Sequence, residues 1–395
     1  MKGPTRLVNA ALGAVMATMT AGAAFAQDPI TIGYSIARTG IYAAAAPSQE
    51  NPYKLWQKQV NAEGGLELPD GERRPVEFVS YDDQSNPANT VRIYEKLITQ
   101  DDVDLLAAPW GTPMHLALAP VLQRYKMPMV GNTAASVQLR NVAPGYIWFP
   151  TSAIPDAMGA ELAKMMQAEG VETAALLANE LPYSQEFRSF LIPALEEAGI
   201  EVTVDESYPP DVKDMTSMLV EVREAAPDAV VAMTYPADSF LFAGQARELG
   251  IDAPFVMSLI GPTIDAYRKA NGAGANGIVS SAHWSSEADA WPKGQAFFDA
   301  YVAEFGEEPD ALDSALAYMS MEILQQAVAE AGLDPEALRG AIADGTFDTI
   351  NGEVRFDGVQ NVVTPTGFVQ IQDGKIELVW PEAVKTADFA PKQGW

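Results

Sequence analysis

The segment Thr31–Ala43, TIGYSIARTGIYA, decides the fold, because it combines a strand pattern with an abrupt end. Ile30, Ile32 and Tyr34 alternate with other residues, which predicts a β-strand with one apolar face. Small residues, an arginine, a hydroxyl and a glycine then follow. A strand that ends in this way is often followed by a loop that contacts a ligand. A nucleotide phosphate, a catalytic centre and a small solute are the alternatives at this point.

The pattern of Thr31–Ala43 is the first unit of a βα alternation. Strands are predicted at 30–34, 76–80, 103–108 and 128–131, and helices at 48–63, 87–100 and 113–125. This order, βαβαβαβ, is typical of a parallel sheet with helices on both faces.

The alternation restarts after Phe149-Pro150-Thr151 and predicts a second α/β unit. Its helices are predicted at 155–169, 184–198, 213–225, 238–249 and 262–270, and its strands at 173–178, 201–205, 229–233 and 255–258. Two successive units of one architecture, in a chain longer than one core usually supports, predict two lobes.

The last third of the chain departs from the βα order. A strand at 277–282 leads to helices near 293–305, 311–331 and 335–343, and then to a β-rich tail in which Asp373-Gly374 marks a hairpin. We infer that the chain returns to the first lobe and crosses once more, which gives three linkers. The predicted lobes are 27–150 with 284–352 and 151–283 with 353–395.

The N-terminal segment is typical of a secretory signal peptide. Lys2 and Arg6 precede an uncharged apolar run, and Ala24-Phe25-Ala26 matches a cleavage site, so residues 1–26 are predicted to be removed. The sequence contains no cysteine, which excludes disulfides, thiol nucleophiles and a lipid anchor on an N-terminal cysteine. We therefore expect an exported protein of the periplasm.

The chain is strongly acidic, with a formal net charge of −28. Phosphate affinity rests on clustered Lys and Arg, so we expect no nucleic acid and no anionic lipid as a partner.

The recognisable motifs favour structure over chemistry. Asn271–Gly277, NGAGANG, contains G-x-G-x-x-G, but it follows a helix and precedes a strand, so a helix-terminal turn is favoured over a dinucleotide site. Asp82 and Asp83 are expected in a turn and in helix capping. His115 and His283 match no catalytic or metal motif. We expect no enzyme, no metal and no cofactor.

The loops after the predicted strands share hydroxyls, exposed glycines and large aromatic side chains. These loops are Arg38–Tyr42, Trp110–Thr112, Asn132–Ser136, Leu181–Ser184, Thr234–Pro236 and Leu259–Gly261. In open α/β sheets, ligands lie at the carboxyl ends of strands. Two of the loops precede helices, whose N-terminal N–H groups can hold a carboxylate without a lysine.

At these residues the chain resembles the leucine/isoleucine/valine-binding protein family, which supplies substrates to ABC importers. The resemblance rests on Thr39-Gly40, on Val60–Gly65, on Tyr81-Asp82-Asp83 with Pro87, on Pro182-Tyr183-Ser184 and on Gln245–Gly250. It covers essentially the whole chain after residue 26. It implies the type I periplasmic binding protein fold, an α/β fold of two Rossmann-like lobes with three hinge strands.

The resemblance also implies roles for the loops. Residues 110–112 and 132–136 would hold the ligand carboxylate, and Tyr183 and Tyr235 would close over it. Amino-acid-binding members carry an acidic residue where this chain has Leu259, which favours an aromatic or other carboxylate over an α-amino acid, because a buried ammonium group needs an anionic partner. The predicted ligand-binding residues are Arg38, Thr39, Tyr42, Trp110, Gly111, Thr112, Asn132, Thr133, Ser136, Tyr183, Tyr235 and Leu259.

The function that we predict is binding of a small organic solute by lobe closure. The closed monomer would dock on an ABC permease in the inner membrane. A periplasmic sensory receptor with a signalling partner is the alternative. For Arg38, contact with the ligand carboxylate and contact with water at the rim both remain open.

Overall fold

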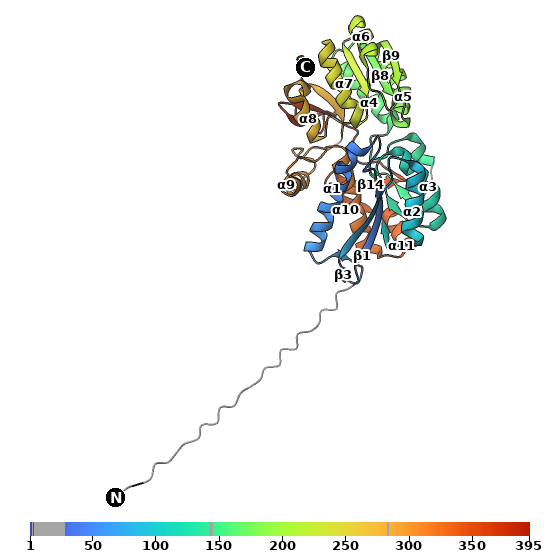
Figure 1. The fold of residues 1–395 in the computed structure, drawn as a ribbon, viewed down its shortest axis with the longest axis vertical. Coiled ribbons are helices and arrows are strands. Elements are labelled where there is room, and N and C mark those ends of the chain that lie inside the picture. Colours follow the sequence, from blue (N-terminus) through green and yellow to red (C-terminus); the bar gives the residue numbers. More distant parts are fainter. Residues whose placement is uncertain (2, 4–27, 142–144, 283) are drawn as a thin grey trace.

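The structure, a computed structural model, describes residues 1, 3, 28–141, 145–282 and 284–395. Apart from Met1 and Gly3, the predicted signal peptide lies outside the described residues. Two lobes lie one above the other, and the chain passes between them more than once (Figure 1). The prediction of an α/β fold with two lobes is confirmed.

The sheet of the first lobe is built around β1 (Ile30–Ile36). β1 pairs in parallel with β4 (Val76–Asp82) on one side and with β5 (Leu105–Leu106) on the other. β6 (Met129–Val130) pairs in parallel with β7 (Ile147–Trp148). Ile30, Ile32 and Ile36 are fully buried, so the apolar residues of the opening segment form the core of this lobe.

Helices cover both faces of this sheet. They are α1 (Ala46–Ala62), α2 (Pro87–Thr99), α3 (Thr112–Tyr125), α10 (Asp313–Ala331) and α11 (Pro335–Asp344). α10 packs against α1, although the two are far apart in the sequence (Figure 1). α2 begins where its sequence predicts, because the Asn86 side chain accepts hydrogen bonds from two backbone N–H groups and Pro87 follows it.

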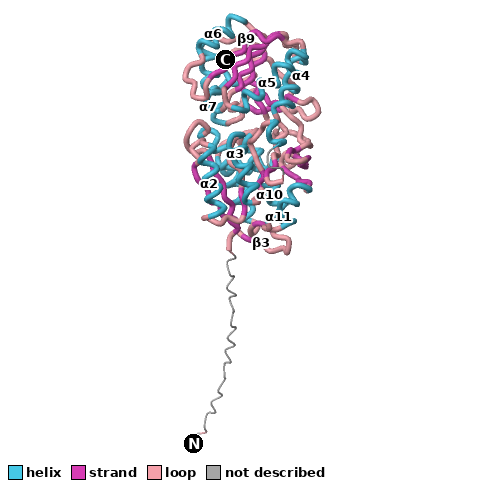
Figure 2. The backbone as a smooth tube through the Cα atoms, turned by 90° about the vertical axis from the view of Figure 1, so that its right-hand side faces the viewer, coloured by secondary structure: helices cyan, strands magenta, loops and turns pink. Residues whose placement is uncertain are grey.

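The second lobe contains a single seven-stranded sheet in the order β17-β16-β12-β11-β10-β8-β9. Its parallel strands are β8 (Thr173–Asn179), β9 (Glu201–Tyr208), β10 (Ala229–Met233), β11 (Phe255–Ser258) and β12 (Ile278–Ser281). Its helices are α4 (Pro155–Ala168), α5 (Pro182–Ala198), α6 (Thr216–Ala225), α7 (Pro236–Leu249) and α8 (Asp265–Asn271). These helices lie around the strands (Figure 2).

The end of the chain contributes to both lobes. After β12 come α9 (Gly294–Phe305) and the strands β13 (Thr346–Thr349), β14 (Gly352–Asp357) and β15 (Gln360–Asn361), which pair with one another. β16 (Phe368–Gln372) then pairs antiparallel with β12, and β17 (Lys375–Trp380) pairs with β16. The predicted hairpin at Asp373-Gly374 is confirmed.

The lobe boundaries remain a proposal. The N–H of Phe149 donates to Val359 O, and the N–H of Asn361 donates to Phe149 O, so β15 lies beside the first crossing. Because β14 pairs with β13 and β15 with β14, we propose that the third crossing follows residue 361 and does not begin at 353.

Two small elements have no counterpart in the sequence prediction. β2 (Leu66–Glu67) and β3 (Arg73–Arg74) form a short hairpin between α1 and β4. The short 3₁₀ helices η1 (Ala43–Ala45), η2 (Val137–Asn141) and η3 (Gly272–Ala275) also lack a strong pattern. η3 occupies the NGAGANG segment and follows α8, which confirms that this segment is a helix-terminal turn.

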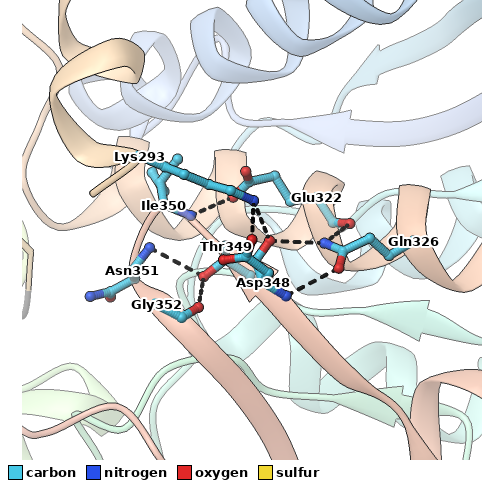
Figure 3. A network of polar contacts seen from close by, with 8 residues as sticks. All are labelled: Lys293, Glu322, Gln326, Asp348, Thr349, Ile350, Asn351 and Gly352. Carbon is cyan, nitrogen blue, oxygen red and sulfur yellow. Dashed lines mark hydrogen bonds and ion pairs between the residues drawn. The ribbon is translucent and has the colours of Figure 1, made fainter. Parts of the chain in front are cut away.

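A polar network docks the β13–β14 hairpin on α10 (Figure 3). The N–H of Ile350 donates to Glu322 Oε2 at 2.7 Å, and Gln326 exchanges two hydrogen bonds of 3.0 Å with the backbone of Asp348. Lys293 Nζ lies 2.9 Å from both the Asp348 carbonyl and its carboxylate. Burial raises the pKa of Glu322 to about 8.

This shift predicts how stability depends on pH. Between the ordinary pKa of 4.5 and about 8, Glu322 has lost its proton in the unfolded chain but keeps it in the folded one. The free energy of unfolding should therefore fall as the pH rises through this interval. Glu322→Gln keeps the acceptor for Ile350, and we expect it to reduce this fall in urea titrations. Glu330→Gln, at an exposed position of the same helix, is the control; equal slopes for wild type and Glu322→Gln would contradict the assignment.

Candidate ligand-binding site

The carboxyl ends of strands from both lobes meet at one small cavity of about 30 Å³. It is lined by Trp110, Gly111, Thr112, Thr133, Ala135, Thr151, Ala153, Tyr183, Tyr235, Ile260, Leu312, Asp313 and Leu316. This volume is on the order of one water molecule, so the cavity is small in this form. The residues come from loops of the first lobe, from a crossing segment, from the second lobe and from the start of α10.

The N-terminus of α3 forms one wall of the cavity. Gly111 has φ +86°, a conformation that glycine adopts without strain, and its N–H donates to Thr133 Oγ1 at 2.8 Å. The Thr112 hydroxyl donates to Ala135 O at 3.1 Å and accepts from Ala135 N at 3.0 Å, which ties the two loops together. Among the described residues, none accepts a hydrogen bond from the N–H of Thr112. This N–H and the helix dipole make the wall suitable for an anionic group.

His115 supports both loops from below. Its Nδ1 lies 2.8 Å from Gly111 O, and the N–H of Asn132 donates to its Nε2 at 3.3 Å, so the neutral ring carries its proton on Nδ1. Burial lowers the pKa of His115 to about 4. His115 is thus fully buried and positions the two loops.

Aromatic rings from the two lobes meet at the cavity. The ring centroid of Tyr42 lies 4.9 Å from that of Trp110, and the Tyr235 centroid lies 5.8 Å from Tyr42 and 6.2 Å from Trp110. Tyr183 is also buried and directs its hydroxyl at the sulfur of Met158, 3.0 Å away. Burial raises the pKa of Tyr42 to about 12, so its hydroxyl remains protonated. These rings offer apolar surface with polar edges.

Asp313 is the charged residue of the cavity lining, and reasoning from the sequence missed it. It is the first residue of α10 and is 3% exposed, and its Oδ2 accepts a hydrogen bond from Trp110 Nε1 at 2.8 Å. Burial raises its pKa well above the ordinary value, and the nearby Asp310 carboxylate adds to this shift. No local pattern marks this residue, because 203 positions separate it from Trp110.

Arg38 and Thr39 are exposed and do not line the cavity. Arg38 Nη2 lies 2.6 Å from Glu50 Oε1 and donates to Ser80 Oγ at 2.8 Å. The hydroxyl of Thr39 donates to Asp82 Oδ2 at 2.8 Å. Asp82 also accepts from the N–H groups of Arg38 and Gln84, so its role is to hold this loop. Arg38 therefore has partners within its own lobe.

Three other predicted residues lie behind the cavity wall. Asn132 is fully buried and donates through Nδ2 to the Tyr53 hydroxyl at 2.8 Å. Ser136 Oγ accepts from the N–H of Gln138 at 3.1 Å. The Leu259 side chain is fully buried in the core, and the next residue, Ile260, lines the cavity instead. The structure thus brings together Trp110, Gly111, Thr112, Thr133, Tyr183 and Tyr235, with Tyr42 beside them.

A larger cavity of about 250 Å³ lies elsewhere, between the segment after β12, the segment after α9 and the β16–β17 hairpin. None of its lining residues is the last residue of a strand or the first residue of a helix. Within the described residues, no group of three or more acidic or histidine side chains is placed to hold a metal ion. No helix in the same part of the chain has the length and apolar character needed to cross a bilayer.

Two α/β lobes with a cavity at their facing strand ends define a bilobal solute-binding protein. Comparison with known families agrees: the model of the periplasmic binding protein family matches residues 29–375. The chain belongs to the periplasmic binding protein family.

Relatives and solved structures extend this comparison. The Leu/Ile/Val-binding protein homolog 7 of Brucella suis is 22% identical, covering 95% of this chain and 97% of that protein. LivJ from Streptococcus pneumoniae, solved with isoleucine, has a TM-score of 0.80 at 22% identity and covers 90% of this chain and 100% of its own. A solute-binding protein from Rhodopseudomonas palustris, solved with benzoate, has a TM-score of 0.79 at 20% identity and covers 93% and 98%. These structures share the fold of this chain.

The position of His115 yields a prediction about acid stability. Between its ordinary pKa of 6.5 and about 4, the unfolded chain binds a proton that the folded chain excludes. The free energy of unfolding should therefore fall as the pH drops through this interval. We expect His115→Gln to be less stable at neutral pH, because a loop support is lost, but to show a weaker fall on acidification. Urea titrations across this range measure both effects, and an unchanged acid slope would contradict the assignment.

Proposed function

We propose that this protein is the periplasmic substrate-binding component of an ABC importer and closes its two lobes around a small organic carboxylate. The observation that carries the proposal is the meeting of strand ends from both lobes at a cavity with a helix N-terminus on one side and aromatic rings on the other. The closed form would then dock on a membrane permease.

The carboxylate is inferred from the donors of the first lobe. The N–H of Thr112 lies at the start of α3, where the helix dipole favours negative charge. The hydroxyl of Thr133 lies beside it, where it accepts from the N–H of Gly111 and donates to Asn132 Oδ1, and it would exchange this acceptor for the ligand on binding. The cavity lining contains no lysine or arginine. Neutral donors suit a ligand that must be bound and then released, because they avoid the cost of burying a cationic side chain.

Contacts between the lobes support a closing motion. Tyr235 of the second lobe packs on Tyr42 of the first, and Arg268 Nη1 on α8 lies 2.5 Å from Glu308 Oε2 in the segment after α9. A ligand that touches both lobes only in the closed form shifts the population toward it. A near-complete switch needs about a 10⁴-fold preference, or about 5.5 kcal/mol.

A thermal-shift screen tests this function. The ligand classes are branched-chain amino acids, aromatic acids, short carboxylates and amides. We expect a carboxylate to raise the melting temperature, because a ligand that binds only the folded state stabilises it by RT ln(1 + [L]/Kd).

The Tyr235→Ala variant is the control for the position of the site. Removing the ring should weaken binding of the selected carboxylate by about 10-fold or more and leave the circular dichroism spectrum unchanged. If no carboxylate shifts the wild type, the proposed function fails. If Tyr235→Ala binds with unchanged affinity, the ligand lies elsewhere.

The ion pair between the lobes predicts that a substitution outside the ligand-binding cavity also changes the affinity for the ligand. Glu308→Gln removes the partner of the buried Arg268 outside α8 and leaves its pair with Asp265 within α8, so the closed form loses stability relative to the open form. We expect the Kd to rise about 3- to 10-fold, with the order of ligand preference kept, and the ligand-free protein to scatter X-rays as a more extended particle. Lys269→Gln removes a pair within α8 and is the control. Equal Kd values for Glu308→Gln and wild type would contradict a role in closure.

The alternative from the sequence, a periplasmic sensory receptor, shares the ligand-binding step and differs in the partner. Permease and ATPase genes beside the gene would support import, whereas an adjacent kinase gene would support sensing.

A further inference from the structure

Asp313 contributes an acidic group to the cavity lining. It lies on α10, and the family resemblance points to no ligand-binding residue on this helix. It stands at the start of α10, after the chain has returned to the first lobe, and it lies beside Trp110 and the N-terminus of α3. Leu312 and Leu316 of the same segment also line the cavity. The cavity therefore has an acidic group next to the wall that suits a carboxylate.

The carboxyl of Asp313 has only part of its hydrogen-bonding capacity filled. Oδ2 accepts from Trp110 Nε1, but none of the described residues donates to Oδ1. Oδ1 is therefore not fully enclosed by the protein, and Asp313 is one of the residues that line the cavity. A carboxyl that is 3% exposed and has a free oxygen toward a cavity is arranged to accept from something inside it.

The charges around Asp313 indicate what that occupant is. The titratable groups that act on it are Asp310 in the preceding segment and Tyr183 on α5. Within the described part of the chain, no lysine, arginine or histidine forms an ion pair with Asp313. A buried carboxylate without a cation is costly, so the empty protein keeps this carboxyl protonated. A cationic group in the cavity would supply the missing charge.

We propose that Asp313 selects ligands that carry a cationic nitrogen, an ammonium or amidinium group, in addition to the carboxylate. This inference rests on the proposed function, because the carboxylate is held by the start of α3. On binding, the Asp313 carboxyl releases its proton to the buffer, and the resulting carboxylate accepts hydrogen bonds from the ligand nitrogen. The lack of an acid at Leu259 therefore does not leave the site without one.

Matched ligands test the proposal. Leucine carries both charged groups, isocaproate has the same side chain with the carboxylate alone, and isoamylamine has it with the amine alone. Phenylalanine, hydrocinnamate and phenethylamine form a second set of the same kind. We expect the compound with both groups to bind the wild type most tightly in at least one set. Asp313→Asn should weaken that compound by about 30-fold or more and change the affinity of its amine-free analogue by less than about 3-fold.

Glu322→Gln is the matched control, because it neutralises another acid of α10 that lies outside the cavity lining. It should leave the difference between the two ligands unchanged. Calorimetry of the wild type in phosphate and in Tris gives a readout without a variant. If one proton is released on binding, the two apparent binding enthalpies should differ by the difference between the ionisation enthalpies of the two buffers. This readout remains decisive if Asp313→Asn does not fold.

The outcomes separate this inference from the proposed function. If amine-free carboxylates bind the wild type as tightly as their amino counterparts, or if binding releases no proton, the role of Asp313 is refuted while carboxylate binding stands. If none of the carboxylates binds, the proposed function is refuted and this inference falls with it.

Discussion

The geometry of parallel strands is the constraint on which the rest of this structure depends. All the parallel strands of one lobe end at the same edge, so the loops after β1, β5 and β6 are neighbours although the sequence separates them. The second lobe repeats this arrangement with the loops after β8, β10 and β11. The cavity lies where the two edges face each other, and the buried imidazole of His115 fixes the relative position of two of its loops.

Much of this arrangement could be predicted from the sequence, because local patterns govern it. Apolar alternation locates β1, a short apolar run locates β8, and Asn86-Pro87 marks the start of α2 to the residue. Half of the predicted site residues line the cavity, since position after a strand is a good guide to position at the edge. Arg38 shows the limit of this guide: it follows a strand, yet its side chain bonds to Glu50 on α1 and Ser80 on β4 and does not line the cavity.

Asp313 could not be predicted in this way, because no sequence pattern near it indicates a ligand-binding site. Its segment reads as the start of an ordinary helix, and only the return of the chain to the first lobe brings it to Trp110. The argument from Leu259 considered a single strand end as the source of an acid, whereas the fold supplies one from another element. Contacts between distant segments thus set the chemistry of the cavity, while local patterns set its place.

The same crossings affect how the protein can fold. The first lobe is incomplete without α10, whose apolar residues pack against α1, and the sheet of the second lobe is incomplete without β16 beside β12. Both partners come from the last quarter of the chain. Neither lobe can therefore finish folding while the chain is still emerging, and the high sequence separation of these contacts favours slow folding. Each lobe thus acquires its full set of contacts only when the last quarter of the chain is available.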